Sequence, residues 1–290
     1  MNAFISHDRY FDPESGRLSS YFSKLFILIG QESLQYGILD TEKNTFVALA
    51  DLRLPSSPKT PEAFYADISR LISEEEVLKK KYPSVVIGLD TPMHTLVPAP
   101  LFDSEQSKRY LEFNFGMTGD GQVSADRIEE IDAYNVYAIP QGLLDVVRVN
   151  YREAALFHRT SAMIRAIYNH QKVNPAPAAI FLNVREQFID LTSIESDRLA
   201  YFNSYSCASK EDMLYYTLYA IEQLNLRPDS VQLFISGLID NGSESHRLLE
   251  QYIREVSFSD RLNLWDYSPL LGQLPAHRYQ ELYALALCGS

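Results

Sequence analysis

The sequence predicts an α/β fold in which one unit of strands and helices is written twice, as two halves around a central cleft. Short apolar or alternating runs of strand length are interleaved with stretches whose apolar residues recur at helical spacing. The order strand, hairpin, strand, helix, strand, helix fills Ala178–Ile253, and a shorter version of it fills Lys24–Asn114. A cleft between two such halves is the expected place for a ligand.

Composition and charge narrow the possible classes of protein. The chain has 290 residues, 46% hydrophobic and 22% charged, which suits a globular protein large enough for two domains. Its formal net charge of -12 repels phosphate backbones, so nucleic acid is not an expected partner. No apolar run is long enough for a membrane span, and residues 1–23 lack the apolar core of a signal peptide. We therefore expect a cytoplasmic protein.

The first half opens with a predicted three-strand meander. The apolar run Lys24–Gly30 is typical of a strand buried on both faces, and the alternating runs Ser33–Leu39 and Thr45–Leu54 follow it. Thr60 directly before Pro61 indicates a helix N-terminus, because a threonine caps well there and proline needs no N–H donor at the first helical position.

This first helix is expected to continue to Pro83. Its last turns would then carry the pairs Glu75/Lys79 and Glu76/Lys80 on one solvated face, which is the ordinary interpretation of the adjacent acidic and basic runs.

The middle of the first half is predicted to contain a strand, a helix and a glycine-containing segment. The strand is predicted at Ser84–Asp90, and Asp103 with Gln106 suggests a capping box for a helix that ends near Asn114. The glycine-containing segment Phe115–Asp132 follows a helix instead of a strand, so we interpret it as a flexible loop and not as a phosphate-binding loop. The elements predicted next are the strand Tyr134–Ile139 and the helices Gln141–Val149 and Tyr151–Gln171.

The proline-rich linker Asn174–Pro177 is the predicted boundary, with residues 1–173 forming the first half and 174–290 the second. The first half includes an N-terminal arm, Met1–Ser23, expected to be irregular or an edge strand. The elements predicted for the second half are the strands Ala179–Asn183, Gln187–Ile194, Arg198–Ser206, Ser230–Ser236 and Arg261–Asp266, a helix Ser209–Leu226 with a Ser209/Asp212 capping box, a further helix after Ser236, and a last helix Arg278–Cys288.

Residue types that often carry chemistry have plain interpretations here. The two cysteines, Cys207 and Cys288, are expected to be small core residues. The six histidines show no metal-ligand spacing and are expected at surfaces or caps. The tyrosines of the second half's first helix favour semi-buried packing, with a partner surface as the alternative; they are Tyr215, Tyr216 and Tyr219.

Three phrases carry a resemblance to a known group of proteins. They are Leu96–Asp103 (LVPAPLFD), Arg109–Asn114 (RYLEFN) and His277–Cys288 (HRYQELYALALC). With the repeated element order, the chain resembles an uncharacterised bacterial family of unknown function with the actin-like ATPase fold. This ribonuclease H-like superfold also contains actin, the sugar kinases, the heat-shock seventy chaperones and the cell-division and type IV pilus assembly proteins. The resemblance implies the fold and brings no activity with it.

Each of the three nucleotide motifs that the superfold implies is altered, although a glycine survives in the first hairpin and one remains of the adenosine pair. Active members carry an aspartate and a glycine in the first hairpin, for magnesium and phosphate, where this chain has Gly30 and Gln31. In the second hairpin Arg185 and Glu186 replace small residues, and only Gly237 remains of the paired glycines that would contact adenosine. These five cleft positions predict a degenerate site without metal or cofactor, although ATP with magnesium stays possible.

Two further hypotheses concern charged residues. Arg185 could bind a different anion directly, or serve as an ion-pair residue. Asp90, at the carboxyl end of a strand, and Asp190, expected on a solvent face, could form a general acid and base pair, but no motif supports it.

The sequence therefore favours a non-catalytic scaffold or protein-interaction module, which binds a protein partner or itself through the cleft, exposed sheet edges and the tyrosine-rich helix. The alternative is a nucleotide-binding switch or ATPase with a diverged site, where Gly30, Gly237 and Asp90 still hold a nucleotide. A third hypothesis is a small-molecule kinase like the sugar kinases, which needs a catalytic aspartate that has no clear position in this sequence.

Overall fold

The computed structural model describes residues 5–12, 20–54, 60–116 and 119–288, and the predicted α/β class is confirmed. The contacts of the chain divide it into two compact units. The first unit contains Met1–Met163, Asn263–Gln273 and Glu281–Ser290, and the second contains Ile164–Leu262 and Leu274–Gln280. The division falls inside a helix and not at Asn174–Pro177, and the last part of the chain is shared between the units.

The main sheet of the first unit has the strand order β1-β4-β3-β2-β5-β9, with β15 also on β4. The meander β2-β3-β4 is antiparallel, while β5 and β9 run parallel to β2. The strands are β1 (Ile5–Phe11), β2 (Ser23–Ile29), β3 (Ser33–Asp40), β4 (Thr45–Arg53), β5 (Ser84–Leu89), β9 (Ala155–His158) and β15 (Asp266–Tyr267).

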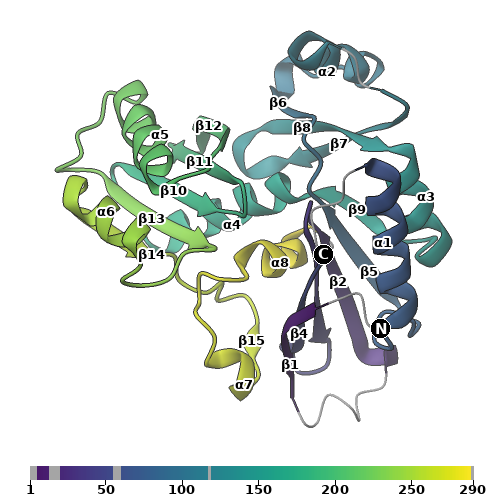
Figure 1. The fold of residues 1–290 in the computed structure, drawn as a ribbon. Coiled ribbons are helices and arrows are strands. Elements are labelled where there is room, and N and C mark those ends of the chain that lie inside the picture. Colours follow the sequence, from purple (N-terminus) through teal and green to yellow (C-terminus); the bar gives the residue numbers. More distant parts are fainter. Residues whose placement is uncertain (1–4, 13–19, 55–59, 117–118, 289–290) are drawn as a thin grey trace. The chain divides into compact units, whose positions relative to one another are not determined.

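Helices cover both faces of this sheet. On one face, α1 (Pro61–Glu74) and α3 (Gln141–Asn150) pack together over the apolar residues of β2 to β5 (Figure 1). On the other face, α8 (Gln280–Ala284) and the 3-10 turn Leu285–Leu287 fill the space over β5, where a Cβ on Gly88 would lie 2.6 Å from Leu285. The predicted helix Arg278–Cys288 is therefore present in a shorter form.

The second unit has one five-stranded sheet in the order β12-β11-β10-β13-β14. Again two antiparallel pairs, β10-β11 and β11-β12, are followed by two parallel pairs, β10-β13 and β13-β14. The elements of this unit are α4 (Arg159–Val173, which begins in the first unit), β10 (Ala179–Val184), β11 (Phe188–Glu195), β12 (Arg198–Ser206), α5 (Lys210–Gln223), β13 (Gln232–Gly237), α6 (Glu244–Tyr252) and β14 (Glu255–Phe258).

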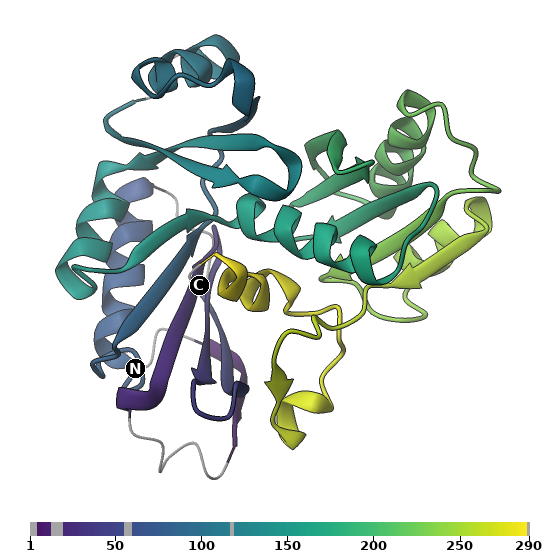
Figure 2. The ribbon, with the colours of Figure 1, turned by 180° about the vertical axis from the view of Figure 1, so that it is seen from behind.

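Helices also lie on the two faces of the second sheet. Helices α5 and α6 cover the face that carries Ile180, Leu182 and Leu233. Helix α4 lies on the opposite face, where the His170 ring contacts Phe181 and Phe234, and Figure 2 shows this face. The capping box at Ser209 and Asp212 is formed as predicted.

A small sheet in the first unit was not predicted. Its order is β6-β8-β7, with β6 (His94–Pro98), β7 (Gly121–Ile128) and β8 (Ala133–Pro140), and α2 (Ser107–Phe115) packs against it. The interpretation of Phe115–Asp132 as a loop is wrong from Gly121 onward, because β7 pairs with β8 along its whole length. Residues 117 and 118 lie outside the described residues.

Several predicted boundaries are also wrong. Helix α1 ends at Glu74, well before Pro83, and Lys79 pairs with Glu76 while Glu75 pairs with Arg9. Asp103 caps only a 3-10 turn, and Gln106 makes no side-chain capping bond.

Three further strands were missed or misplaced because they form only through pairing with other segments. The predicted helix Tyr151–Gln171 contains β9, which pairs with β5 before α4 begins. Near the C-terminus, Arg261–Asp266 was predicted to be a strand. The structure instead has β14, which ends before Arg261, and the two-residue strand β15, which begins at Asp266.

Candidate functional site

The two hairpins that would contain phosphate motifs have the same backbone turn. The N–H of Gly30, directly after β2, donates to the carbonyl of Ser33 at 2.9 Å, and the N–H of Arg185, directly after β10, donates to the carbonyl of Phe188 at 2.9 Å. Gln31 and Glu186 follow these residues and are exposed. Gly30 and Arg185 thus hold matching positions in the two units.

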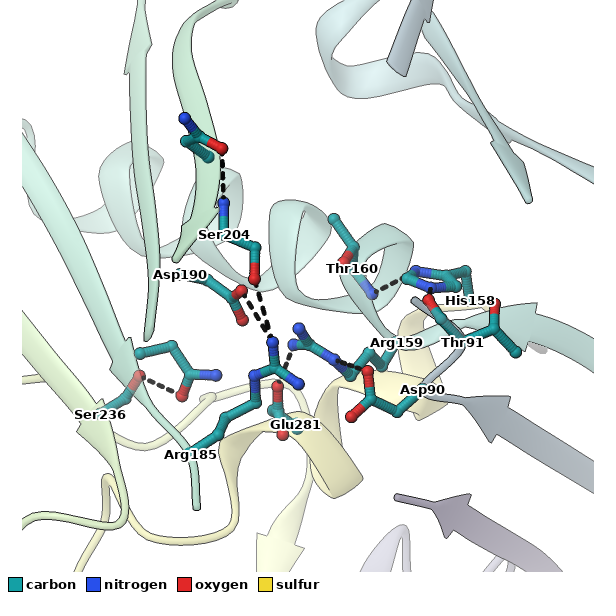
Figure 3. A network of polar contacts seen from close by, with 12 residues as sticks. Asp90, Thr91, His158, Arg159, Thr160, Arg185, Asp190, Ser204, Ser236 and Glu281 are labelled. Atoms are coloured by element: carbon teal, nitrogen blue, oxygen red, sulfur yellow. Dashed lines mark hydrogen bonds and ion pairs between the residues drawn. The ribbon is translucent and has the colours of Figure 1, made fainter. Parts of the chain in front are cut away.

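The Arg185 side chain folds back over its own hairpin. Its Nη2 donates to Oδ1 of Asp190 and to Oγ of Ser204, each at 3.1 Å, as Figure 3 shows. Asp190 and Ser204 face each other across β11 and β12, and the guanidinium also lies 5.1 Å from the Phe188 ring centroid. The ion-pair interpretation of Arg185 is therefore the one that the geometry supports.

Asp190 does not lie on a solvent face, and this prediction is wrong. The Asp190 and Arg185 side chains are 6% and 10% exposed. Alternation along β11 correctly points Asp190 away from the core residues Ile189 and Leu191, but Arg185 covers that side. A buried carboxylate of this kind needs its cation, because an unpaired charge there would be costly.

Gly237 ends β13 in a conformation that needs glycine. Its φ is +85°, and a Cβ at this position would lie 2.1 Å from the carbonyl oxygen of Val184. The next residue, Leu238, donates its N–H to that carbonyl at 2.7 Å, and the N–H of Gly237 donates to the carbonyl of His277 at 2.9 Å. Beside it, Ser236 Oγ donates to Oδ1 of Asn183 at 3.0 Å. Gly237 is thus required by the packing of β13 on β10.

In the first unit, a second buried arginine joins two carboxylates. Arg159, the first residue of α4, donates from Nε to Asp90 at 2.8 Å and from Nη1 to Glu281 at 2.6 Å (Figure 3). The Arg159 side chain is 3% exposed, Asp90 10% and Glu281 18%. Asp90 follows β5 and Arg159 follows β9, so the cluster lies at the carboxyl ends of two parallel strands, where α/β folds commonly bind ligands.

A hydrogen-bond network surrounds His158, the last residue of β9. Its Nε2 faces the carbonyl of Thr91 at 3.0 Å, and its Nδ1 accepts from the N–H of Thr160 at 3.2 Å. Both ring nitrogens therefore have backbone partners. Asp126 accepts from Ser161 Oγ at 2.6 Å and from the N–H of His158 at 2.8 Å. Serine, histidine and aspartate are near one another, but the imidazole does not bond the serine, so this is not the geometry of an activated nucleophile.

The expectation that histidines lie at surfaces or caps is wrong for three of them. His158, His246 and His277 are buried, and burial lowers the pKa of His277 below its ordinary value. His277 Nε2 lies 2.8 Å from the carbonyl of Ile239, which it can reach as a donor. Desolvation also lowers the pKa of His170.

No group of three or more residues suited to metal binding occurs within residues 5–12, 20–54, 60–116 and 119–288. The cysteines Cys207 and Cys288 are half-buried, and burial raises the pKa of the Cys207 thiol. Asp90 and Asp190 belong to different units, and each carboxylate is paired with an arginine of its own unit.

The tyrosines of α5 continue onto the edge strand β12. Tyr216 stacks on Tyr205 with ring centroids 4.2 Å apart, and the hydroxyl of Tyr205 is 2.5 Å from that of Tyr201. Tyr215 and Tyr219 stay 63% and 39% exposed. Semi-buried packing therefore describes Tyr216, while Tyr215 and Tyr219 present an open aromatic surface.

Sequence reasoning missed most of the residues that the structure brings together. Asp126 lies on β7, and Arg159 and Ser161 lie just after β9; neither strand was predicted. Glu281 lies 122 residues from Arg159. In the Arg159 cluster, only Asp90 carried a sequence signal, as the residue at the end of an apolar strand.

Comparisons with known proteins agree with the fold. The profile of a family described as "Protein of unknown function (DUF3822)" matches residues 13–256. Among solved structures, a protein of unknown function with an actin-like ATPase fold from Bacteroides thetaiotaomicron VPI-5482 is 20% identical, with a TM-score of 0.78 over 93% of this chain and 97% of that chain. The PilM–PilN type IV pilus biogenesis complex gives 15% identity and a TM-score of 0.59 over 92% of this chain and 98% of that chain. A comparison with curated protein sequences gives no significant match.

The described part of the chain has no helix long and apolar enough to cross a membrane.

Proposed function

We propose that this chain, which belongs to the DUF3822 family of unknown function and has the actin-like ATPase fold, is a non-catalytic scaffold or protein-interaction module. Within this proposal the nucleotide motifs of the superfold are degenerate and the fold is kept for binding other proteins. Fold alone does not define activity, so the proposal depends on the hairpin of the second unit.

The observation that carries the proposal is the Arg185–Asp190–Ser204 contact. Phosphate binding at a hairpin of this kind needs backbone N–H groups that a ligand can approach. Here a guanidinium covers the hairpin and is already neutralised by Asp190. Glu186 adds an exposed negative charge next to it. An incoming phosphate would have to break a buried ion pair and meet a carboxylate, which disfavours ATP.

A partner surface is supported by two further observations. Tyr215 and Tyr219 are exposed side by side on α5, with ring centroids 6.4 Å apart, and exposed aromatic groups are typical of binding surfaces. In addition, PilM, a structural neighbour, is found in a complex with PilN. We therefore place the contact with a protein partner, or with a second copy of the chain, on α5 and the neighbouring edge strand β12.

An assay of magnesium-dependent ATP turnover tests the proposal. We expect no turnover above that of a Gly237→Asp variant, which would be unable to form the β13 turn. Turnover by the wild-type protein that disappears in this variant and persists in Glu186→Gln would contradict the proposal.

One observation favours a second candidate, a nucleotide-dependent switch. Gly237 keeps φ +85° at the end of β13, the place where the superfold contacts adenosine. The close approach of Val184 explains this glycine without a ligand, so we rank the switch second. Nucleotide that co-purifies with the protein would reverse this order.

A further inference from the structure

The first unit contains an open groove away from the strand ends described above. It has a volume of about 800 Å³ and lies between the chain that follows α1 and the C-terminal end of α3 with the chain after it. The first wall is Leu78–Pro83, which leads into β5, and the second is Val149–Ala154, which leads into β9. This volume is within the range of known ligand sites.

A hydrogen bond joins the two walls of the groove, and a second one holds the first wall. Tyr151 is buried, and its hydroxyl donates to the carbonyl of Leu78 at 3.0 Å, which joins one wall to the other. Tyr82 donates to the carbonyl of Val77 at 3.1 Å, and burial raises its pKa to about 12. Phenols are neutral near pH 7, so Tyr82 and Tyr151 give the groove an uncharged floor.

The rim of the groove is basic. Its charged residues are Lys79, Lys80, Lys81 and Arg152, against the single acid Glu153. Lys79 is paired with Glu76, whereas no ion pair involves Lys80, Lys81 or Arg152 in the part of the chain that the structure describes. In a protein with a net charge of -12, this is a local concentration of available positive charge.

The groove also offers apolar surface. Val149 is 84% exposed at its edge, and the half-buried side chains of Val85 and Ala154 lie in the lining. A purely ionic ligand would leave these groups unused. An extended peptide that carries both carboxylates and aliphatic side chains would use the cations and the apolar surface together.

We propose that this groove binds an acidic segment of a partner protein, in which carboxylates alternate with aliphatic side chains. The carboxylates would pair with Lys80, Lys81 and Arg152, and the aliphatic side chains would pack on Val149 and the tyrosine floor. This inference rests on the proposed function, because it assumes that the physiological ligand is a protein. It adds a surface distinct from the tyrosines of α5.

Fluorescence anisotropy with a labelled decapeptide of alternating glutamate and leucine tests the inference. We expect saturable binding to the wild-type protein and a loss of about tenfold or more in affinity for the double variant Lys80→Glu/Lys81→Glu. The double variant Lys108→Glu/Arg109→Glu on α2 is the matched control, because it changes the net charge equally and at exposed positions. Its affinity should stay within about twofold of wild type.

Further arms of the experiment separate the possible ligands. Val149→Ser should also weaken the peptide, and a decapeptide of alternating lysine and leucine should not bind. Equal binding to the two double variants, or no saturable binding, would overturn the inference. Binding of tripolyphosphate or of phosphatidylglycerol vesicles that needs Lys80 and Lys81, without peptide binding, would also overturn it. ATP turnover would refute the proposed function while leaving the peptide result intact, so the two failures are distinguishable.

Discussion

Arg185 donates to Asp190 across the hairpin of the second unit, with 3.1 Å between Nη2 and Oδ1 and both side chains almost fully buried. Gly30 holds the matching backbone position in the first unit, where no side chain can do this. The two hairpins therefore share a turn but differ in what covers it. In the second unit, the place that the resemblance assigns to a phosphate has an arginine that is already paired.

Removing one partner of the Arg185–Asp190 ion pair should destabilise the folded protein. We expect Asp190→Leu to lower the free energy of unfolding by about 3–5 kcal/mol, because it leaves the Arg185 guanidinium buried without its carboxylate. Urea unfolding followed by circular dichroism measures the loss. The double variant Arg185→Met/Asp190→Leu should recover most of it. A double variant as unstable as the single one would show that the ion pair is not the reason.

The arginine of the first unit should behave in the same way. Arg159→Met leaves Asp90 and Glu281 without the cation between them, and we expect a loss of about 3–5 kcal/mol in unfolding free energy. The single tryptophan, Trp265, packs 5.7 Å from the Phe46 ring in the same unit, so its fluorescence in urea reports this unfolding.

Glu281→Gln should cost less than Arg159→Met, because Arg159 would still have Asp90 as a partner. Equal losses for the two variants would argue against this account of the cluster.

Two glycines with positive φ allow a matched test of close packing. Gly237 and Gly242 have φ of +85° and +72°, but a Cβ meets the Val184 carbonyl at 2.1 Å in the first case and only Arg247 at 3.8 Å in the second. We expect Gly242→Ala to cost about 1 kcal/mol and Gly237→Ala about 3 kcal/mol or more, measured by urea unfolding. Similar costs would mean that β13 can move away from β10.

The buried imidazole of His277 should make stability depend on pH. Its pKa is lowered from 6.5 by burial, so the unfolded chain binds this proton more tightly than the folded chain. The stability that neutral His277 contributes is fully present above about pH 6.5 and is lost as the pH falls through its folded-state pKa. Urea midpoints between pH 7.5 and about 5 should therefore fall less steeply for His277→Gln than for wild type. If the urea midpoints of wild type and His277→Gln fell in parallel with pH, His277 would not be the source of the pH dependence.

The sequence was most informative where a local pattern decides the structure. Strand β2 was predicted from its apolar run, and the helices α1 and α5 were predicted from apolar residues at helical spacing and from their N-cap residues. Strand β7 was not predicted, because its sequence GQVSADRI is polar and its stability comes from pairing with β8. Strand β9 has four residues and exists because β5 offers an edge.

The candidate sites depend on contacts that no local pattern contains. Asp190 alternates correctly on β11, yet its burial comes from Arg185, a residue of the preceding turn that folds back. Arg159 meets Glu281 only because α8 packs on the sheet of the first unit. Such pairs require the folded chain, whereas the five hairpin and turn positions could be named from the resemblance alone.

In the proposed function the protein has the actin-like fold but does not bind nucleotide, and a thermal-shift titration with ATP, ADP and magnesium tests this proposal. A ligand that binds only the folded protein raises its stability by about 2.7 kcal/mol at a hundredfold excess over Kd. We expect no change in Tm at millimolar nucleotide. A clear, saturable rise in Tm for the wild-type protein would contradict it and favour the nucleotide switch.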